Sequence, residues 1–376
     1  MTGGKLLVLQ DSPQFGGHEI MFLKLLPAAL GGAFDEVVVR MPQANGAFFE
    51  ALQRLRAVPL RVKPWHFVKR AAEPWLAGFR HRYARAVREA VVEERPSTIL
   101  LLQGRIENLA VPMLSIPNGH FVVSYIPMAH SLAEMGRTGG LGDRVRRRLY
   151  RRPDRFVVPS PAVADQLARA GARAPVFVVE NVVDPPPMTH RKLRSELGLP
   201  PGRRIALFMG RFDTGQKGLD LLIEALKRGA RALSDWTFLF VGSGAGQAAI
   251  EALHDDPGHT IDIRILPWAE QPYDILQACD ILLMPSRFEG VPLIMLEAMS
   301  CGLPMLASDL DVFRDYLPET HRADFKVVDL ADRLNALTSV HTAAAFAETA
   351  RARIASARLD LSRERFLAAL APGAQR

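Results

Sequence analysis

Short runs of β-branched and aliphatic residues alternate along the chain with longer helical stretches, from the first residues to about residue 308. Such runs predict buried parallel strands, and the stretches between them predict the crossover helices that parallel strands require. We expect strands at residues 5–10, 36–40, 98–102, 120–126, 155–159, 176–180, 204–210, 236–242, 261–266, 280–285 and 303–308. Helices are expected at residues 19–30 and 74–93, among others. The predicted fold class is therefore α/β.

The segment Asp184-Pro185-Pro186-Pro187 separates the predicted strands into two groups. A chain of 376 residues suggests two or three domains at roughly 150 residues per domain. Three consecutive prolines cannot continue a helix or a central strand, so we place a linker at this run. We expect two doubly wound, Rossmann-like domains, at residues 1–186 and 187–357. The end of the chain, residues 358–376, should form a short amphipathic helix that packs back on the first domain.

The composition excludes several protein classes. Apolar residues make up 48% of the chain and charged residues 23%, which is the balance of a globular protein and argues against disorder. Cys279 and Cys301 are too few for a disulfide framework or a zinc cluster, which favours a reducing compartment. The N-terminal apolar run is broken by Gln10 and Asp11 and does not resemble a signal peptide. We expect a soluble, cytoplasmic protein.

The net charge of +7 is concentrated in two basic stretches. Residues 63–88 contain seven Lys or Arg and one acid, and residues 144–155 contain the same numbers. The first stretch also carries five aromatic residues, and a basic, aromatic composition suits an anionic membrane surface. A solvated helix face explains the charge equally well. No zinc-finger or RNA-recognition signature accompanies the stretches, so we expect no nucleic-acid partner.

The segment MPSRFEGVPLIMLEAMSCGLP, residues 284–304, carries the clearest chemical pattern. A strand ends at its start, a turn contains Glu289, and Pro292 opens a helix at a position where proline is favoured. Helix N-termini at the carboxyl ends of strands present amide N–H groups to anions, so the following backbone amides are candidate phosphate ligands: Gly290, Val291 and Leu293. A carboxylate further along, Glu297, can accept two hydrogen bonds from a vicinal diol such as a ribose. The two glutamates can thus address opposite ends of one long ligand, although the pair alone is also consistent with ordinary surface residues.

A second candidate site lies in the segment FMGRFDTGQKGLDLLIEAL, residues 208–226. This segment follows a predicted strand and opens a helix, so the same topological argument applies. Arg211 and Lys217 fall in the loop between the two elements, where two cations can hold a pyrophosphate.

Taken together, these segments resemble the retaining glycosyltransferases of family four. In that family a strand ending in Gly-Arg leads to a Lys-Gly-x-(Asp/Glu) helix start, and two glutamates are separated by seven residues. The matching residues are Gly210, Arg211, Lys217, Gly218, Asp220, Glu289 and Glu297. The resemblance is strong over residues 204–310. It implies the GT-B fold, in which two Rossmann-like domains face each other across a cleft that holds the active site.

The resemblance implies a role for each matching side chain. Arg211 and Lys217 would stabilise the charge on the departing nucleoside diphosphate, in place of a metal, so no metal and no cofactor are expected. Glu289 would contact the donor sugar's hydroxyls, and Glu297 would bind the ribose. The family's favoured account of retention is front-face attack by the acceptor, without a protein nucleophile.

The resemblance is weaker elsewhere in the chain. Gly16 and Gly17 look like the family's N-terminal glycine loop, whose amides would close over the phosphates, and His130 looks like its active-site histidine. Gly242 begins a glycine-rich turn where the backbone can approach the nucleotide. Pro267 replaces a glycine that is common in the base-binding loop.

The implied function is transfer of a sugar, with retention of configuration, from a UDP- or GDP-sugar to a saccharide or lipid-linked acceptor. Bacterial cell-surface polysaccharide or glycolipid synthesis is the implied setting, with the enzyme in the cytoplasm or peripheral on the inner face of the membrane. The alternatives are a nucleotide-sugar epimerase or sugar phosphorylase on the same fold, and a non-catalytic subunit that binds sugar nucleotides.

Overall fold

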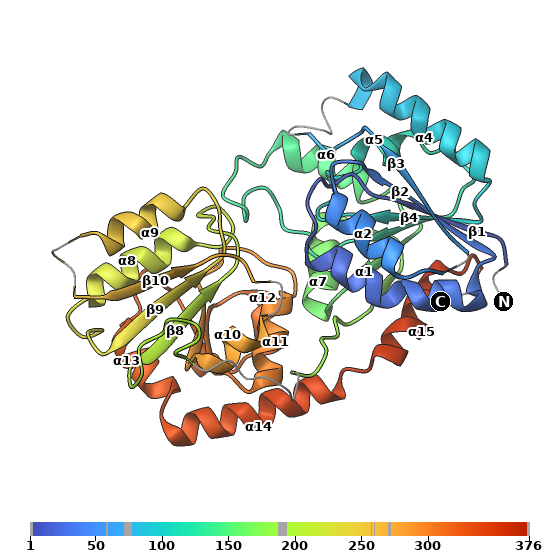
Figure 1. Ribbon diagram of the computed structural model, residues 1–376. Coiled ribbons are helices and arrows are strands. Elements are labelled where there is room, and N and C mark those ends of the chain that lie inside the picture. Colours follow the sequence, from blue (N-terminus) through green and yellow to red (C-terminus); the bar gives the residue numbers. More distant parts are fainter. Residues whose placement is uncertain are drawn as a thin grey trace. The chain divides into compact units, whose positions relative to one another are not determined.

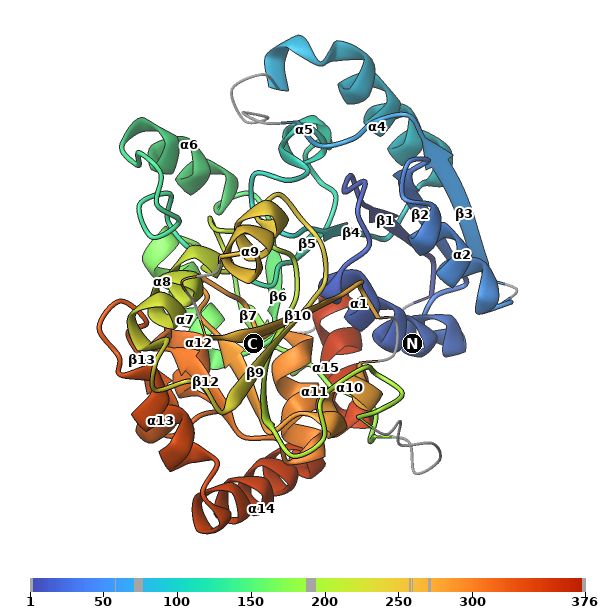
Figure 2. The same cartoon turned by 60° about the vertical axis from the view of Figure 1, so that its left-hand side comes forward.

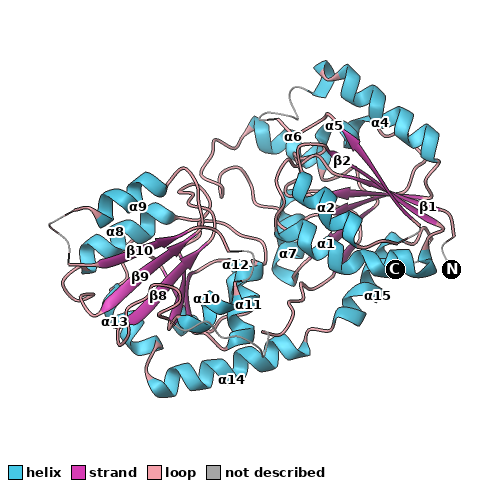
Figure 3. Ribbon diagram, viewed as in Figure 1, coloured by secondary structure: helices cyan, strands magenta, loops and turns pink. Residues whose placement is uncertain are grey.

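The structure, a computed structural model, describes residues 3–57, 59–70, 77–186, 194–256, 258, 260–269 and 272–373. The chain divides into two compact units. The first unit comprises Met1–Ala133, Arg137–Asn181 and Arg358–Arg376, and the second comprises Glu134–Gly136 and Val182–Ala357. Each unit contains one parallel sheet covered by helices on both faces (Figure 3), as the sequence predicted.

The first unit contains a seven-stranded sheet with the order β3-β2-β1-β4-β5-β6-β7, in which every pair is parallel (Figure 2). Its strands are β1 (Lys5–Leu9), β2 (Glu36–Pro42), β3 (Leu60–Trp65), β4 (Thr98–Leu102), β5 (Val122–Tyr125), β6 (Arg155–Val158) and β7 (Val176–Val178). The central strands β1 and β4 are buried on both faces, which is why they read as continuous apolar runs. The direction of strand succession reverses between β1 and β4, which is the topological switch point of the sheet.

Helices cover both faces of this sheet. They are α1 (Gly17–Ala28), the π-helical turn η1 (Ala29–Ala33), α2 (Gly46–Arg54), the 3₁₀ turn η2 (Ala77–Phe79), α4 (His81–Glu94), α5 (Ala110–Ser115), α6 (Leu141–Leu149), α7 (Pro161–Ala170) and α15 (Leu359–Leu370). The C-terminal helix α15 packs beside α1 and against β6 and β7 (Figure 2).

Two side chains, Arg155 and Thr98, bond α15 to the rest of the first unit. The guanidinium of Arg155, which is 7% exposed, donates to the carbonyls of Ala368, Ala369 and Ala371 at 2.9, 3.2 and 2.9 Å. Thr98 Oγ1 donates to the Leu370 carbonyl at 2.9 Å. These bonds satisfy carbonyls at the helix C-terminus that have no partner within the helix.

The second unit contains a six-stranded parallel sheet with the order β10-β9-β8-β11-β12-β13. Its strands are β8 (Arg204–Met209), β9 (Trp236–Val241), β10 (Asp262–Leu266), β11 (Ile281–Met284), β12 (Met305–Ser308) and β13 (Arg322–Ala323). Its switch point lies between β8 and β11, so the carboxyl ends of these two strands are neighbours.

The helices of the second unit also lie on both faces, with α8 and α9 on one face and α10 and α11 on the other (Figure 1). They are α8 (Leu219–Gly229), α9 (Gln247–His254), α10 (Tyr273–Ala278), α11 (Leu293–Cys301), α12 (Asp311–Arg314), the 3₁₀ turn η3 (Glu319–His321), α13 (Leu330–Leu337) and α14 (Val340–Ser356). The core between sheet and helices includes Trp236, Phe212 and Phe240, all essentially inaccessible to solvent.

The structure corrects the sequence-based elements in three places. Strand β3 was not predicted because it is an edge strand whose charged residues, Arg61 and Lys63, alternate with apolar ones. Strand β13 was not predicted either, because it is only two residues long. The helix expected at residues 74–93 is observed as η2 followed by α4, and its first three residues lie outside the described part of the chain.

Among the described residues, no helix is both long enough and apolar enough to cross a membrane.

Candidate functional site

The candidate site of the second unit lies at the carboxyl ends of β8 and β11. The loop after β8, residues 210–218, carries Lys217 and is called the lysine loop here. The loop after β11, residues 285–292, carries Glu289 and is called the glutamate loop. Because β8 pairs directly with β11, the two loops are neighbours at the position where open α/β sheets bind ligands.

Lys217 and Glu289 form an ion pair between the two loops. Lys217 Nζ lies 2.6 Å from Glu289 Oε1, and Ser286 Oγ donates to the same oxygen at 2.8 Å. The side chains of Lys217 and Glu289 are only 18% and 5% exposed. A charge pair this shielded from water interacts more strongly than a surface pair, and its members are held in a defined geometry.

Gln216 connects Arg211 to this pair. Its side-chain oxygen accepts a hydrogen bond from Arg211 Nη2 at 2.8 Å, and its Nε2 donates to Glu289 Oε2 at 3.3 Å. Arg211 itself is more exposed and also pairs with Asp213 at 3.4 Å. The structure therefore brings three of the predicted catalytic residues of this unit, Arg211, Lys217 and Glu289, into one hydrogen-bonded cluster.

Two glycines allow the loops to approach this closely. Gly218 has φ +64°, and a Cβ added to it would lie 2.0 Å from the Pro285 carbonyl oxygen. Gly242, the first residue after β9, has φ +144°, and a Cβ there would lie 2.0 Å from the Gly210 carbonyl oxygen. Only glycine fits at either position, both because of the space and because of the positive φ. The glycine-rich turn that begins at Gly242 is thus packed directly against the lysine loop.

Helix α11 begins at Leu293, and Pro292 is its N-cap residue with φ −68° and ψ 131°. The sequence placed Pro292 inside the helix, so that prediction was wrong by one residue. Gly290 and Val291 precede the cap, so the three amides named as phosphate ligands lie at the helix N-terminus. Glu297 lies further along α11. The pKa of the Tyr273 hydroxyl on α10 is raised, first by the burial of Tyr273 and then by the nearby charge of Glu297.

Pro267 follows β10, next to the glycine-rich turn. The Gly242 amide donates to the carbonyl of Leu266, the last residue of β10, at 3.1 Å. Pro267 and Gly242 therefore lie at the same sheet edge as the lysine loop, with Trp268 next to Pro267 and 60% exposed.

The predicted residues of the first unit lie at the corresponding edge of its sheet. Gly16 is the N-cap residue of α1, and its amide donates to Glu19 Oε2 at 2.9 Å, while Gly17 is the first residue of the helix. His130 follows β5 and is 6% exposed, and its carbonyl accepts a hydrogen bond from Arg146 Nη1 at 2.8 Å. The Gly16 amide, which was expected to contact phosphate, thus donates its hydrogen bond to the buried Glu19 carboxylate.

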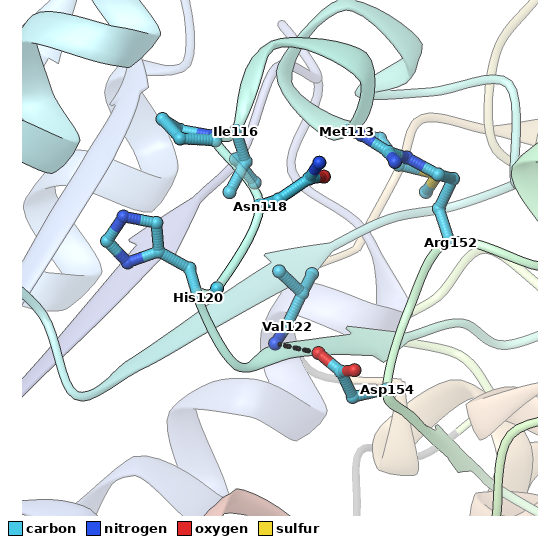
Figure 4. Close-up of a pocket in the computed structure, with 9 residues that line it drawn as sticks. Met113, Ile116, Asn118, His120, Val122, Arg152 and Asp154 are labelled. Atoms are coloured by element: carbon cyan, nitrogen blue, oxygen red, sulfur yellow. Dashed lines mark hydrogen bonds between the residues drawn. The ribbon is translucent and has the colours of Figure 1, made fainter.

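A pocket of the first unit lies at the opposite edge of the sheet. It is formed by the residues before β5 and β6, among them Asn118, His120 and Arg152 (Figure 4). The Val122 amide donates to Asp154 Oδ2 across its floor at 2.8 Å. Ligands of open parallel sheets bind at the carboxyl ends of strands, and this pocket lies at the amino ends. We therefore assign it no part in the candidate site.

The aromatic residues of the first basic stretch are mostly part of the fold. Trp65 and Tyr83 are 7% and 1% exposed, and Phe67 stacks on Tyr83 at 4.6 Å between ring centroids. Phe79 is 81% exposed, while Trp75 lies outside the described residues. Among the described aromatic residues of this stretch, Trp65 and Tyr83 are therefore not available to contact a membrane surface, whereas Phe79 is exposed.

The second basic stretch retains most of its exposed cations. Arg146 is buried and pairs with Glu107 and Asp143, and Arg155 is buried beneath α15. The remaining arginines of the stretch are exposed: Arg144, Arg147, Arg148, Arg151 and Arg152.

Within the described ranges, no group of three or more His, Cys, Asp or Glu side chains is placed to hold a metal ion.

Sequence reasoning missed Gln216, Ser286 and Arg287. Gln216 and Ser286 both bond the Glu289 carboxylate, and Arg287 bonds the lysine loop. All three stand within the two segments that the sequence singled out, but their contacts depend on how the loops meet, which residue spacing does not reveal.

Two family models match the chain. One, described as glycosyl transferases group 1, matches residues 203–349. The other, described as glycosyltransferase family 4, matches residues 15–186. The two matches therefore account for most of the chain.

Curated relatives align with part of the chain. An alpha-galactosylglucosyldiacylglycerol synthase from Streptococcus pneumoniae is 27% identical over 183 residues, covering 46% of this chain and 49% of the relative. A phosphatidyl-myo-inositol mannosyltransferase from Mycolicibacterium smegmatis is 31% identical over 142 residues, covering 37% of this chain and 36% of the relative. The chain thus spans about half the length, or less, of these relatives.

Solved structures align over nearly the whole chain. Anabaena Alr3699/HepE in complex with UDP and glucose aligns with a TM-score of 0.75 and 20% identity, covering 96% of this chain and 98% of that one. WaaG, a glycosyltransferase involved in lipopolysaccharide biosynthesis, aligns with a TM-score of 0.71 and 17% identity, covering 98% of this chain and 100% of WaaG. At these identities the likeness establishes a common fold. With both family models matching, one over each unit, the chain belongs to the group 1 glycosyltransferases of family four.

Proposed function

We propose that this protein is a retaining glycosyltransferase that moves a sugar from a nucleoside diphosphate sugar to a saccharide or lipid-linked acceptor. The observation that carries the proposal is the cluster of Lys217, Glu289 and Arg211 at the switch point of the second sheet. It combines cations suited to a diphosphate with a carboxylate suited to sugar hydroxyls.

The cluster supplies the charge stabilisation that the reaction needs. Negative charge builds on the leaving diphosphate, and preorganised cations stabilise it most in a site shielded from water. Lys217 and Arg211 act on this charge, with the amides at the N-terminus of α11 as further donors. Because two cations are in place, the reaction proceeds without a metal. Glu289, held by Ser286 and Gln216, accepts hydrogen bonds from the donor sugar.

The donor is a UDP- or GDP-sugar, and the acceptor belongs to cell-surface polysaccharide or glycolipid synthesis. Support comes from the names of similar proteins: one solved structure contains UDP and glucose, and two relatives are named for glycolipid or phosphatidylinositol substrates or products. A non-catalytic subunit would bind the nucleotide without transferring sugar, so a transfer assay distinguishes the two functions.

The test is sugar release from a panel of UDP-, GDP- and ADP-sugars by the wild type and Lys217→Ala. We expect Lys217→Ala to lower turnover by about two to three orders of magnitude, the scale for losing one charge-stabilising group. Lys227→Ala is the matched control, because Lys227 lies on the exposed side of α8, where it pairs with Glu224 at 3.1 Å. Chelator should leave the wild-type rate unchanged. A Lys217→Ala enzyme of full activity, or a strict need for manganese, would contradict the proposal.

We further propose that the exposed arginines of residues 144–152 contact the anionic inner face of the membrane. Leu141, at the start of the same helix α6, is 62% exposed, and a basic helix with an exposed apolar residue suits a lipid surface. The test is sedimentation with phosphatidylglycerol vesicles at low and physiological salt. Changing Arg144, Arg147 and Arg148 to Gln should abolish co-sedimentation, while the matched triple change of Arg82, Arg85 and Arg88 on α4 should not. No sedimentation of the wild type at either salt concentration would refute the contact.

A further inference from the structure

Arg287 holds the lysine loop against the glutamate loop. Its Nη1 and Nη2 donate to the two carboxylate oxygens of Asp220, the second residue of α8, at 2.6 and 2.7 Å. Nη1 also donates to the carbonyl of Thr214, and the Arg287 amide donates to the carbonyl of Gln216 at 2.8 Å. One residue of the glutamate loop is therefore bonded to the lysine loop at two points and to the helix that follows it.

The chief contribution of these bonds is geometric. The side chains of Arg287 and Asp220 are 34% and 45% exposed, and ion pairs this exposed add little to stability. A bidentate guanidinium–carboxylate pair nevertheless fixes the relative orientation of its two partners. The carbonyls of Thr214 and Gln216, on either side of Gly215 in the sequence, both accept hydrogen bonds from Arg287, so Arg287 also fixes the path of the backbone between them.

The backbone that Arg287 fixes carries the residues of the candidate site. Gln216 is bonded through its carbonyl to Arg287 and through its side chain to both Arg211 and Glu289. Lys217 is the next residue and pairs with Glu289. A displacement of this backbone would therefore change the distance from Lys217 to Glu289 and the orientation of Arg211 at the same time.

We infer that Arg287 is a positioning residue for the diphosphate site: it sets the separation of the two loops at which Lys217, Arg211 and Glu289 act on one ligand. Arg287 acts through the lysine loop and not on the reacting atoms. The inference rests on the proposed function, because it assigns the site to a nucleoside diphosphate.

The test measures UDP affinity by calorimetry, and thermal unfolding, for the wild type, Arg287→Gln, Arg287→Lys and Arg314→Gln. Arg314→Gln is the matched control, since Arg314 makes a bidentate pair with Asp309 in the same unit, at 2.9 and 2.8 Å, and touches neither loop through it. We expect Arg287→Gln to raise the Kd for UDP about tenfold to 100-fold, the scale for misplacing binding groups by about 1 Å. The Kd of Arg287→Lys should lie between those of Arg287→Gln and the wild type, because an ammonium keeps the charge but cannot make the bidentate pair. Arg314→Gln should bind UDP as the wild type does.

A double variant tests whether Asp220 and Arg287 act together. Asp220→Asn alone should raise the Kd, and adding it to Arg287→Gln should raise the Kd little further, because both changes remove the same interaction. Additive effects, or a wild-type Kd in Arg287→Gln, would overturn the inference.

The remaining outcomes also have a definite meaning. If Arg287→Gln is unfolded at the assay temperature, Arg287→Lys decides, and a wild-type Kd in that folded variant would overturn the inference. A wild-type protein that binds none of UDP, GDP and ADP would instead refute the proposed function, and the positioning role would fail with it.

Discussion

Gly218→Ala tests the close approach of the lysine and glutamate loops. Gly218 has φ +64°, and the added Cβ would lie 2.0 Å from the oxygen and 2.9 Å from the carbon of the Pro285 carbonyl. Cβ atoms essentially never come within 3.0 Å of another heavy atom, so the two loops must separate by about 1 Å to accept the methyl group. Both groups are backbone, so no side chain can rotate away to relieve the contact.

The expected cost has two parts. An alanine in the left-handed conformation costs about 1–2 kcal/mol, and overpacking at a rigid contact costs about 1–3 kcal/mol more. The free energy of unfolding of the second unit should therefore fall by about 2–5 kcal/mol. The separation of the loops should also weaken UDP binding by up to about 100-fold, since the Lys217–Glu289 cluster is assembled across the contact.

Gly198→Ala is the matched control. Gly198 also lies in the second unit and has φ +66°, but no atom lies within 4 Å of its added Cβ. It should therefore show only the conformational cost, about 1–2 kcal/mol, and an unchanged Kd for UDP. Urea unfolding and calorimetric titration of both variants separate the two parts of the cost. If Gly218→Ala matches Gly198→Ala in stability and binds UDP like the wild type, the loops do not depend on this contact.

Two further substitutions test ion pairs and the C-terminal helix. Arg287 lowers the pKa of Asp220 below its ordinary value of 3.8, so this carboxylate contributes stability that is fully present above pH 3.8 and is lost as pH falls through the lower, folded-state pKa. The difference in unfolding free energy between the wild type and Asp220→Asn should therefore be constant from about pH 7 to about pH 5 and should shrink towards about pH 3. A difference that grows on acidification would contradict the stabilising role of the Asp220 carboxylate. Arg155→Met removes the donor to three carbonyls of α15 and should lower the stability of the first unit by about 2–4 kcal/mol in thermal unfolding. The exposed Arg151→Met is its control, and equal melting temperatures for these two variants would show that Arg155 does not anchor the helix.

Most of the fold followed from the sequence because the central strands of both sheets are buried on both faces. Strands such as β4 and β9 are continuous apolar runs and were predicted to within one or two residues. The edge strand β3 was not predicted, because one of its faces carries charged residues that pair with Glu36, Glu93 and Glu94. Periodicity identifies a strand only where burial imposes a pattern on it.

The candidate site was partly predictable for a topological reason. Lys217 and Glu289 both follow strands, and strands adjacent at a switch point bring their loops together, so their proximity required only the strand order. The contacts of Gln216 and Arg287 depend on the backbone path within each loop, which no spacing rule supplies. Arg146 and Arg155 looked like surface charge in the sequence, yet both are buried and bonded, because composition does not distinguish a solvated arginine from one that caps or pairs inside the fold.

The attachment of α15 to the first unit has a consequence for biosynthesis. The first unit is interrupted by the second and includes Arg358–Arg376, which are synthesised only after the whole of the second unit. The second unit is nearly continuous in sequence, so all of its residues are synthesised before the first unit can be completed. The first unit therefore depends on residues that are synthesised after the second, and a chain that ends before residue 358 would leave β6 and β7 of the first sheet without their covering helix.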